Sequence, residues 1–386
     1  MVSAVAGQFL FGIILALLGT LFGIRVVTDA LALDVARQTV LLVVLFAGQL
    51  ICTALAGRVV DRFGGMHVLA VGAGGMAAGL ACLGMARSFP IVLVAVVVMS
   101  AGGSAVNAAA NVLVSTVYGA RRGQMLNVLG IFTALGALML PFVLAGTASM
   151  DALRARLLAL AAAAVVSALV HAAAREPARA AHHAAPSSAW RLLGDNRVRL
   201  LTVMLALDFG SEAVVCGWIA TYTLGTVPEA PATAMVAVYW GALMAGRAVW
   251  PSVLSRVPKL PFVAAASLCV AVSCLGISQA YSTATLSIAV ACAGFTLSPL
   301  APTLLSVAGD WYPRQTGTVF GLLLALGQIG SVALPWIVGR MAIDVGFRPA
   351  MFVPAVAAAL VTGVTLWLRT HATTRDSSAL AAAEAS

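Results

Sequence analysis

The chain has 386 residues, of which 62% are apolar and only 9% are charged, and its mean hydropathy is +1.04. Soluble domains carry roughly 25% charged and about 45–50% apolar residues, so this composition excludes a soluble globular protein. The net charge of +9 comes from 22 basic and 13 acidic residues. Because the basic residues lie mostly in loops between apolar runs, they indicate membrane orientation rather than nucleic-acid binding.

Apolar runs separated by Gly, Pro and charge clusters predict twelve membrane-spanning segments. Backbone groups in lipid must be satisfied within a segment, and no run alternates like a barrel strand, so we expect an all-α membrane protein. The predicted spans of the first half are 5–27, 36–56, 66–86, 90–116, 126–147 and 154–174. Those of the second half are 199–225, 231–251, 260–280, 283–308, 316–340 and 348–368.

The spans divide the chain into an N-terminal six-helix half (1–174), a linker (175–198), a C-terminal six-helix half (199–368) and a tail (369–386) that we expect to be disordered. If both termini are cytoplasmic, 15 basic residues lie on that side and 7 on the other. Cytoplasmic loops carry an excess of Arg and Lys. We therefore expect a multi-pass protein of the cell (inner) membrane with a cytoplasmic linker, tail and termini.

The two halves repeat each other at offsets close to half the chain length. Gly57-Arg58 matches Gly246-Arg247 at an offset of 189, and Ala101-Gly102 matches Ala293-Gly294 at 192. The segment from Gly136 to Phe142 matches the one from Gly330 to Trp336 at 194. Pseudo-symmetric six-helix halves are typical of a transporter whose site lies between them near the bilayer midplane.

The run Gly57-Arg-Val-Val-Asp61-Arg62-Phe-Gly64 resembles the loop motif between helices 2 and 3 of the major facilitator superfamily. The resemblance implies the major facilitator fold and a charged pair that latches one conformation and is released in another. The alternative is a positive-inside loop with a turn glycine. The residues that we expect to contribute to gating are Asp61, Arg62, Arg122 and Arg247.

Later segments resemble the fucose:proton symporter family and its sodium-coupled glucose-transporter relatives. They are Gly210-Ser-Glu212 and Gly217-Trp218 on span 7, Tyr239-Trp240-Gly241 and Gly246-Arg247 on span 8, and Ser298-Pro299 and Pro302-Thr303 on span 10. Three features depart from the family pattern. Gly130 stands where relatives often carry His or Gln, Asp208 stands where many carry Tyr, and spans 1 and 4 lack an acidic residue. The coupling chemistry of the fucose symporter is therefore not transferred to this chain.

Asp208 and Glu212 are the acidic residues that lie deep inside a predicted span. An intramembrane carboxylate is costly unless it is paired or hydrated, so it indicates function by default. Four residues apart on one helix face, the two acids are suited to cycle a proton or to bind sodium with backbone and hydroxyl oxygens. The structural alternative is a protonated acid, or a pair neutralised by an arginine such as Arg25 or Arg247.

Polar and aromatic side chains inside the spans predict a site for a hydroxyl-rich solute. Amides both donate and accept hydrogen bonds, and aromatic faces suit the C–H faces of sugar rings. The alternative is interhelical hydrogen bonding or aromatic packing. The substrate-binding candidates are Gln49, Asn107, Asn111, Asn127, Trp218, Tyr222, Trp240 and Gln328, and Pro141, Pro299, Pro302 and Pro335 suggest interrupted helices.

Together these features predict a secondary active transporter that moves a monosaccharide or polyol by alternating access, driven by protons or sodium. Its partners would be that small molecule and the lipid bilayer, and we expect a monomer that binds no nucleic acid. We expect no catalytic residues, metal site or cofactor beyond the co-transported ion, and no enzymatic activity. The alternatives are a proton-driven exporter of amphipathic drugs or metabolites, and a membrane sensor that binds without transporting.

Overall fold

The computed structural model describes residues 1–118, 121–175 and 189–384, except for the side chains of residues 56–57, 122, 189–190 and 371–384. Most of the predicted linker therefore lies outside the described residues. Every regular element in the described part is a helix, and twelve helical segments are long and apolar enough to cross a membrane. The predicted all-α membrane architecture is confirmed.

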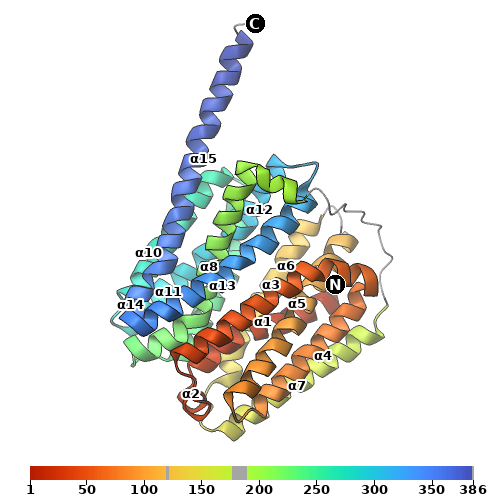
Figure 1. Ribbon diagram of the computed structural model, residues 1–386, viewed down its shortest axis with the longest axis vertical. Coiled ribbons are helices and arrows are strands. Elements are labelled where there is room, and N and C mark those ends of the chain that lie inside the picture. Colours follow the sequence, from red (N-terminus) through yellow and green to blue (C-terminus); the bar gives the residue numbers. More distant parts are fainter. Residues whose placement is uncertain (119–120, 176–188, 385–386) are drawn as a thin grey trace.

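Helices α1–α7 form the N half, and helices α8–α15, preceded by a short 3-10 helix, form the C half (Figure 1). The N half contains α1 (Val2–Phe22), α2 (Arg25–Ala30), α3 (Val35–Phe63), α4 (Gly65–Gly84), α5 (Phe89–Tyr118), α6 (Arg122–Leu144) and α7 (Met150–Ala173). The C half contains η2 (Ala189–Gly194), α8 (Asn196–Thr226), α9 (Ala232–Leu254), α10 (Lys259–Ser278), α11 (Thr283–Leu297), α12 (Leu300–Trp311), α13 (Thr316–Val345), α14 (Phe347–Ala350) and α15 (Phe352–Glu384).

Two predicted spans are interrupted in the structure. The first was expected over 5–27, but α1 ends at Phe22, and Gly23 and Ile24 separate it from the short helix α2. The tenth is broken between α11 and α12 at Ser298-Pro299, because proline cannot donate the backbone hydrogen bond that would continue the helix. Pro141 and Pro335 instead remain inside α6 and α13, so the interruptions predicted at these two prolines are not observed.

The last predicted span ends at 368, whereas α15 continues to Glu384. Side chains beyond residue 370 lie outside the described part. The disordered tail expected over 369–386 and the boundaries of the two halves therefore stay predictions.

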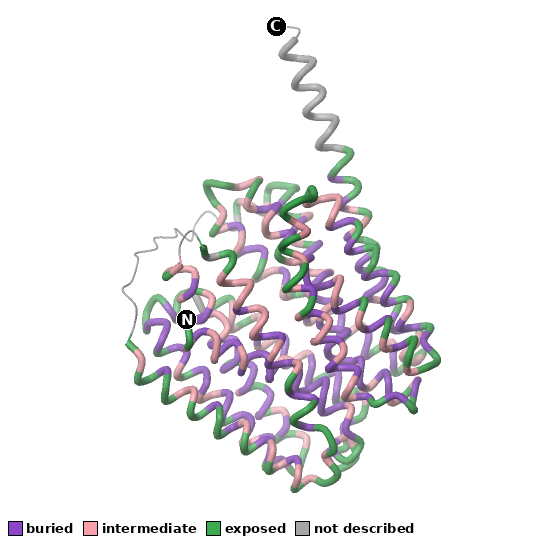
Figure 2. The backbone as a smooth tube through the Cα atoms, turned by 180° about the vertical axis from the view of Figure 1, so that it is seen from behind, coloured by how far each residue is buried: buried purple, intermediate pink, exposed green. Residues whose placement is uncertain are grey.

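The two groups of helices pack side by side, and buried residues gather where helices face one another (Figure 2). Large apolar side chains also lie on the outside, among them Leu169, Val272 and Ile288, each more than half exposed. Such a surface is stable against lipid chains but not against water. We call the end of the bundle where α1 and α8 begin the linker end, and the opposite end the far end.

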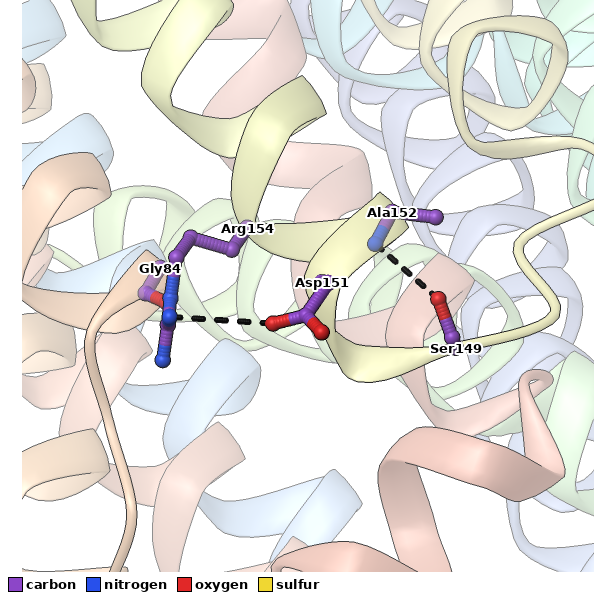
Figure 3. A network of polar contacts seen from close by, with 5 residues as sticks. All are labelled: Gly84, Ser149, Asp151, Ala152 and Arg154. Carbon is purple, nitrogen blue, oxygen red and sulfur yellow. Dashed lines mark hydrogen bonds and ion pairs between the residues drawn. The ribbon is translucent and has the colours of Figure 1, made fainter.

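Helix ends are fixed by local polar contacts. At the far end, the Ser149 hydroxyl accepts a hydrogen bond from the Ala152 N–H and so caps α7 (Figure 3). Arg154 forms an ion pair of 3.7 Å with Asp151 and donates from Nε to the Gly84 carbonyl, which ties α7 to the end of α4 (Figure 3). At the linker end, the carboxylate of Asp195 caps α8 by accepting from the Arg197 N–H.

The same close packing of backbones recurs in both halves. A Cβ atom at Gly12 would overlap the carbonyl of Thr133, where α1 meets α6, and one at Gly136 would overlap the carbonyl of Phe9. In the C half, where α8 meets α13, Gly210 and Gly330 have the equivalent roles, the latter against the carbonyl of Ala206. Glycine is required at these crossings because any side chain would force the helices apart.

A second repeated contact corrects the sequence alignment of the halves. Gly48 packs against the Ser100 hydroxyl, and Gly246 packs against the Ser298 hydroxyl. Both members of this contact are related by an offset of 198, as are Gly12 and Gly210. The packing therefore makes Gly48 the counterpart of Gly246, and the match of Gly57-Arg58 with Gly246-Arg247 at 189 was wrong.

Candidate functional site

A cavity of about 170 Å³ lies between the two halves. Seven spans contribute to it, three from the N half and four from the C half. The lining residues are Phe11, Leu15, Phe46, Gln49, Asn107, Phe209, Glu212, Ala213, Cys216, Trp240, Arg247, Leu297, Ser298, Ala301, Pro302, Gln328 and Ser331.

Pseudo-symmetry brings matching positions of the two halves to opposite walls of this cavity. At the offset of 198, Phe11 corresponds to Phe209 and Leu15 to Ala213, and all four line the cavity. The same offset pairs Gln49 with Arg247. The cavity therefore lies at the interface that a two-fold repeat generates, which is where secondary transporters with repeated halves bind their solutes.

Of the two predicted ion-coupling acids, the structure brings only Glu212 to the cavity wall. Helix α8 turns Phe209, Glu212, Ala213 and Cys216 toward the cavity. Asp208 lies one turn nearer the linker end and is 3% exposed, and its Oδ1 atom has no hydrogen-bond partner among the described residues. Four residues correspond to about 400°, so two such residues differ by about 40° around the helix. This difference places Asp208 behind the wall.

Arg247, predicted to act in gating, lines the cavity together with Glu212. Its NH1 atom donates a hydrogen bond of 2.6 Å to the Gly130 carbonyl of α6 in the other half. No carboxylate oxygen of Glu212 lies within 4.0 Å of an Arg247 nitrogen, although the two charges interact electrostatically. A Cβ atom at Gly130 would lie 2.5 Å from Arg247 NH1. The absence of a side chain at Gly130 thus makes room for the guanidinium.

In the N half, Asn107 reaches the cavity as part of a hydrogen-bonded network. Its Oδ1 atom accepts from Gln8 Nε2 and from Asn111 Nδ2, each at 2.9 Å. Thr133 in turn donates to Gln8 Oε1 at 2.8 Å. Because the Asn107 oxygen is occupied by two donors, its own N–H groups, which have no partner among the described residues, are left for the cavity.

This network includes two residues that the sequence analysis missed, Gln8 and Thr133. It also shows that Asn111 supports Asn107 and does not itself line the cavity. The signal for Gln8 was present in the sequence, as an amide inside the first apolar run. A buried polar residue in a span requires a partner, but the sequence does not identify that partner.

Three further predicted residues line the cavity: Gln49, Trp240 and Gln328. Gln49 is 5% exposed and Trp240 is 1% exposed. The donor atoms Gln49 Nε2 and Trp240 Nε1 have no hydrogen-bond partner among the described residues. Since buried donors are nearly always paired, these two are available for a guest in the cavity.

The remaining substrate-binding candidates lie outside the cavity. Trp218 donates from Nε1 to the Pro335 carbonyl, and Tyr222 donates to the Ile277 carbonyl, and both are fully buried toward the far end. Asn127 donates to the backbone carbonyl of Arg247. Trp218 and Tyr222 follow the last cavity residue of α8, so the structure does not bring these two side chains to the cavity, and their predicted contact with a substrate stays a prediction.

The gating residues near the linker end have no observed latch. Asp61 and Arg62 are exposed, and Arg62 lies over the ring of its neighbour Phe63, 5.4 Å from the centroid. Among the described side chains, Asp61 forms no ion pair, and the side chain of Arg122 lies outside the described part. A latch formed by these residues stays a prediction.

At the far end the halves are in direct contact. A Cβ atom at Gly19 of α1 would overlap the Cys216 carbonyl of α8, and one at Gly339 would overlap the Thr39 side chain. The Thr221 hydroxyl donates to Gln38 Oε1 across the interface at 2.8 Å. Besides this bond, the described hydrogen bonds between the halves are the two at Arg247. The cavity is therefore sealed on its far-end side by backbone contact and small residues.

Comparisons with known proteins agree with this architecture. A family model described as Major Facilitator Superfamily matches residues 4–280. No curated protein sequence matches the chain.

Several solved structures share the fold. The E. coli fucose:proton symporter FucP is 18% identical, with a TM-score of 0.66 over 95% of this chain and 98% of that one. The human organic anion transporter MFSD10 (TETRAN) is 16% identical, with a TM-score of 0.67 over 94% and 97%. An inward-facing bacterial homologue of the human lysosomal transporter Spinster is 14% identical, with a TM-score of 0.72 over 94% and 95%. The chain belongs to the major facilitator superfamily.

Proposed function

We propose that the protein is a secondary active transporter that moves a small polar solute, a monosaccharide, a polyol or a derivative of one, by alternating access coupled to protons. The observation that carries this proposal is the carboxylate of Glu212 in a cavity between the halves, facing polar side chains from both of them. An acid in that position changes its charge when it binds a proton, and its surroundings change when the halves rock.

The surroundings of Glu212 favour a proton over sodium. A sodium site would need several oxygen ligands in place of water, whereas the cavity holds the guanidinium of Arg247 within electrostatic range of Glu212. A fixed positive charge repels a second cation. A proton bound covalently to the carboxylate leaves no net charge on Glu212, so its interaction with Arg247 is simply reduced.

The cavity favours a polar solute over the amphipathic cargo of an exporter. Two of its buried donors, Gln49 Nε2 and Trp240 Nε1, have no protein partner in the described part of the chain. A hydroxylated solute satisfies them, whereas an apolar one leaves them unpaired at a cost of about 1–3 kcal/mol each. The proposed location in the inner membrane with cytoplasmic termini rests on the arginine distribution.

The test is uptake into proteoliposomes of labelled monosaccharides, polyols and their oxidised derivatives, under an imposed proton or sodium gradient. We expect proton-driven accumulation that is lost in Glu212→Gln while exchange of the solute continues. The matched control is Glu229→Gln, which removes an exposed acid in the loop after α8.

Accumulation by Glu212→Gln at the level of the unmodified protein would contradict the coupling role. Accumulation driven by sodium alone would replace the proton in the proposal. Extrusion of amphipathic dyes without uptake of any solute in the panel would favour the exporter.

A further inference from the structure

The cavity presents several hydrogen-bond donors that have no protein partner among the described residues. Gln49 Nε2 and Trp240 Nε1 are buried and have no partner among the described residues. Asn107 lines the cavity, and its oxygen already accepts two hydrogen bonds, so its amide N–H donors are left for a guest. Arg247 adds a guanidinium that has five N–H donors, of which one makes the described side-chain hydrogen bond. These donors come from both halves and surround one space.

The positive charge in the cavity, the guanidinium of Arg247, is available to bind a negatively charged guest. Arg247 and Glu212 are the charged residues of the lining, and they are not joined by a direct ion pair. The Arg247 NH1 atom is hydrogen-bonded to a neutral carbonyl, that of Gly130. Arginine binds carboxylates with paired, parallel hydrogen bonds and prefers them to a neutral acceptor. A guest with a carboxylate is therefore a better partner for Arg247 than any group it contacts in the described structure.

We propose that the transported solute is a polyhydroxy monocarboxylate, a sugar acid, whose carboxylate binds Arg247 and whose hydroxyl oxygens accept hydrogen bonds from Gln49, Asn107 and Trp240. This inference rests on the proposed transport function and names its substrate class.

The volume and the charges of the cavity narrow the chemical class of the solute further. An apolar cavity of about 150 Å³ holds a benzene ring, so the space here, which is about 170 Å³, suits a compact six-carbon solute. A phosphorylated solute would bring about two negative charges at pH 7, against one arginine and one protonatable acid. A monocarboxylate brings one negative charge, which this pair balances.

The same charge count explains the coupling. With the site empty, Arg247 and Glu212 have no net charge, and a bound monoanion leaves one negative charge in the membrane. Protonation of Glu212 removes it, so anion and proton enter together and the loaded carrier is neutral. The other titratable groups near Glu212 are Asp208 and Cys216 on α8 and Tyr239 on α9, while α1 and α13 present none to the cavity.

The experiment uses matched pairs of labelled solutes that differ only in oxidation state. We would measure proteoliposome uptake and direct binding of glucose against gluconate and glucuronate, and of galactose against galactonate and galacturonate. We expect at least one acid to accumulate with a pH gradient and its neutral partner not to accumulate. Because one anion moves with one proton, an electrical potential alone should not drive uptake of the acid.

Three variants locate the carboxylate. Arg247→Gln should weaken binding of the acid about 10-fold or more, and Arg247→Lys should recover part of that loss. Gly130→Ala should have a similar but smaller effect, because its Cβ would displace the guanidinium, while Gly123→Ala on the same helix meets nothing within 4 Å. The ratio of acid to neutral binding is the deciding measurement, because a purely structural role of Arg247 would lower both equally.

The outcomes separate this inference from the transport function. Accumulation of neutral sugars with no preference for their acids would overturn the inference and leave the proposed transporter standing. Acid accumulation that survives in Arg247→Gln would overturn the inference in the same way. If no member of any pair is bound or accumulated, sugar acids are excluded as the substrate class.

Discussion

The two halves have the same packing and different chemistry. Where α1 crosses α6 and where α8 crosses α13, glycines at equivalent positions bring the backbones into contact. At the cavity, the equivalent positions carry Gln49 in the N half and Arg247 in the C half, and Ile14 corresponds to Glu212. Repetition has therefore preserved the positions that fix helix distances, while both charges of the cavity lie in one half. The polar groups that the N half provides to the cavity are neutral, whereas the C half provides both charges together with the neutral donor Trp240.

The largest effect is expected from substitutions that separate the helix pairs packed through glycine, α1 with α6 and α8 with α13. Gly136→Ala or Gly330→Ala places a methyl group against a backbone carbonyl of the neighbouring helix, which cannot move without separating the pair. We expect each variant to lose about 3 kcal/mol of stability, which is at the upper end for overpacking, and to lower the melting temperature in detergent. The controls are Gly123→Ala and Gly321→Ala, whose added methyl groups meet nothing within 4 Å. If Gly330→Ala had the same melting temperature as Gly321→Ala, the stability of the packing between α8 and α13 would not depend on their backbone contact.

An intermediate effect is expected from two tryptophans of the C half. One lies in the cavity wall and the other lies toward the packed far end. Trp240→Phe removes a donor that has no protein partner among the described residues, so we expect about 10-fold weaker uptake affinity and a smaller loss of melting temperature than in Trp218→Phe. Trp218→Phe removes the hydrogen bond of 3.1 Å to the Pro335 carbonyl, so we expect a loss of about 1 kcal/mol of stability with unchanged affinity. Transport kinetics and thermal melting of both variants test the comparison. It would fail if Trp218→Phe changed affinity while Trp240→Phe changed only stability.

The smallest effect concerns a polar contact at the linker end of the C half. The Tyr312 hydroxyl, which follows α12 outside the membrane span, donates to the Asp195 carboxylate that caps α8. Burial, and then the hydrogen bond to Asp195, raise the pKa of Tyr312 above its ordinary value of 10.0. The folded state therefore binds this proton more tightly than the unfolded state, and the contribution is full below about pH 10 and is lost as the pH rises above it.

The variant Tyr312→Phe tests this contact. It should cost about 1 kcal/mol at neutral pH and should flatten the decrease in melting temperature above pH 10. Melting curves between pH 7 and pH 11 would check both expectations. An unchanged alkaline decrease in the variant would assign the pH dependence to other groups.

Much of the fold was predictable, because hydropathy and length determine which segments cross a bilayer. The position of Glu212 at a polar cavity was predictable for a similar reason, since an acid in an apolar span requires a polar environment. The position of Trp218 and Tyr222 outside the cavity was not predictable, because a helical arc shows which residues share a face but not where the cavity ends along it. The match of Arg58 with Arg247 in the internal repeat was at the wrong offset. Only the packing of Gly48 and Gly246 establishes the correct one.

The bond between Arg247 and the Gly130 carbonyl joins the C half to the N half, and it uses the same guanidinium that faces the cavity. Any guest that takes that donor for itself also removes a tie between the halves. Binding a guest and joining the two halves are thus competing uses of one group of atoms. A hydrogen bond to a charged group contributes about 1.5–3 kcal/mol, which is on the scale that shifts a two-state equilibrium by about 10- to 150-fold. In the proposed transporter, binding of the solute at Arg247 would therefore shift the balance between the halves without a separate sensor site.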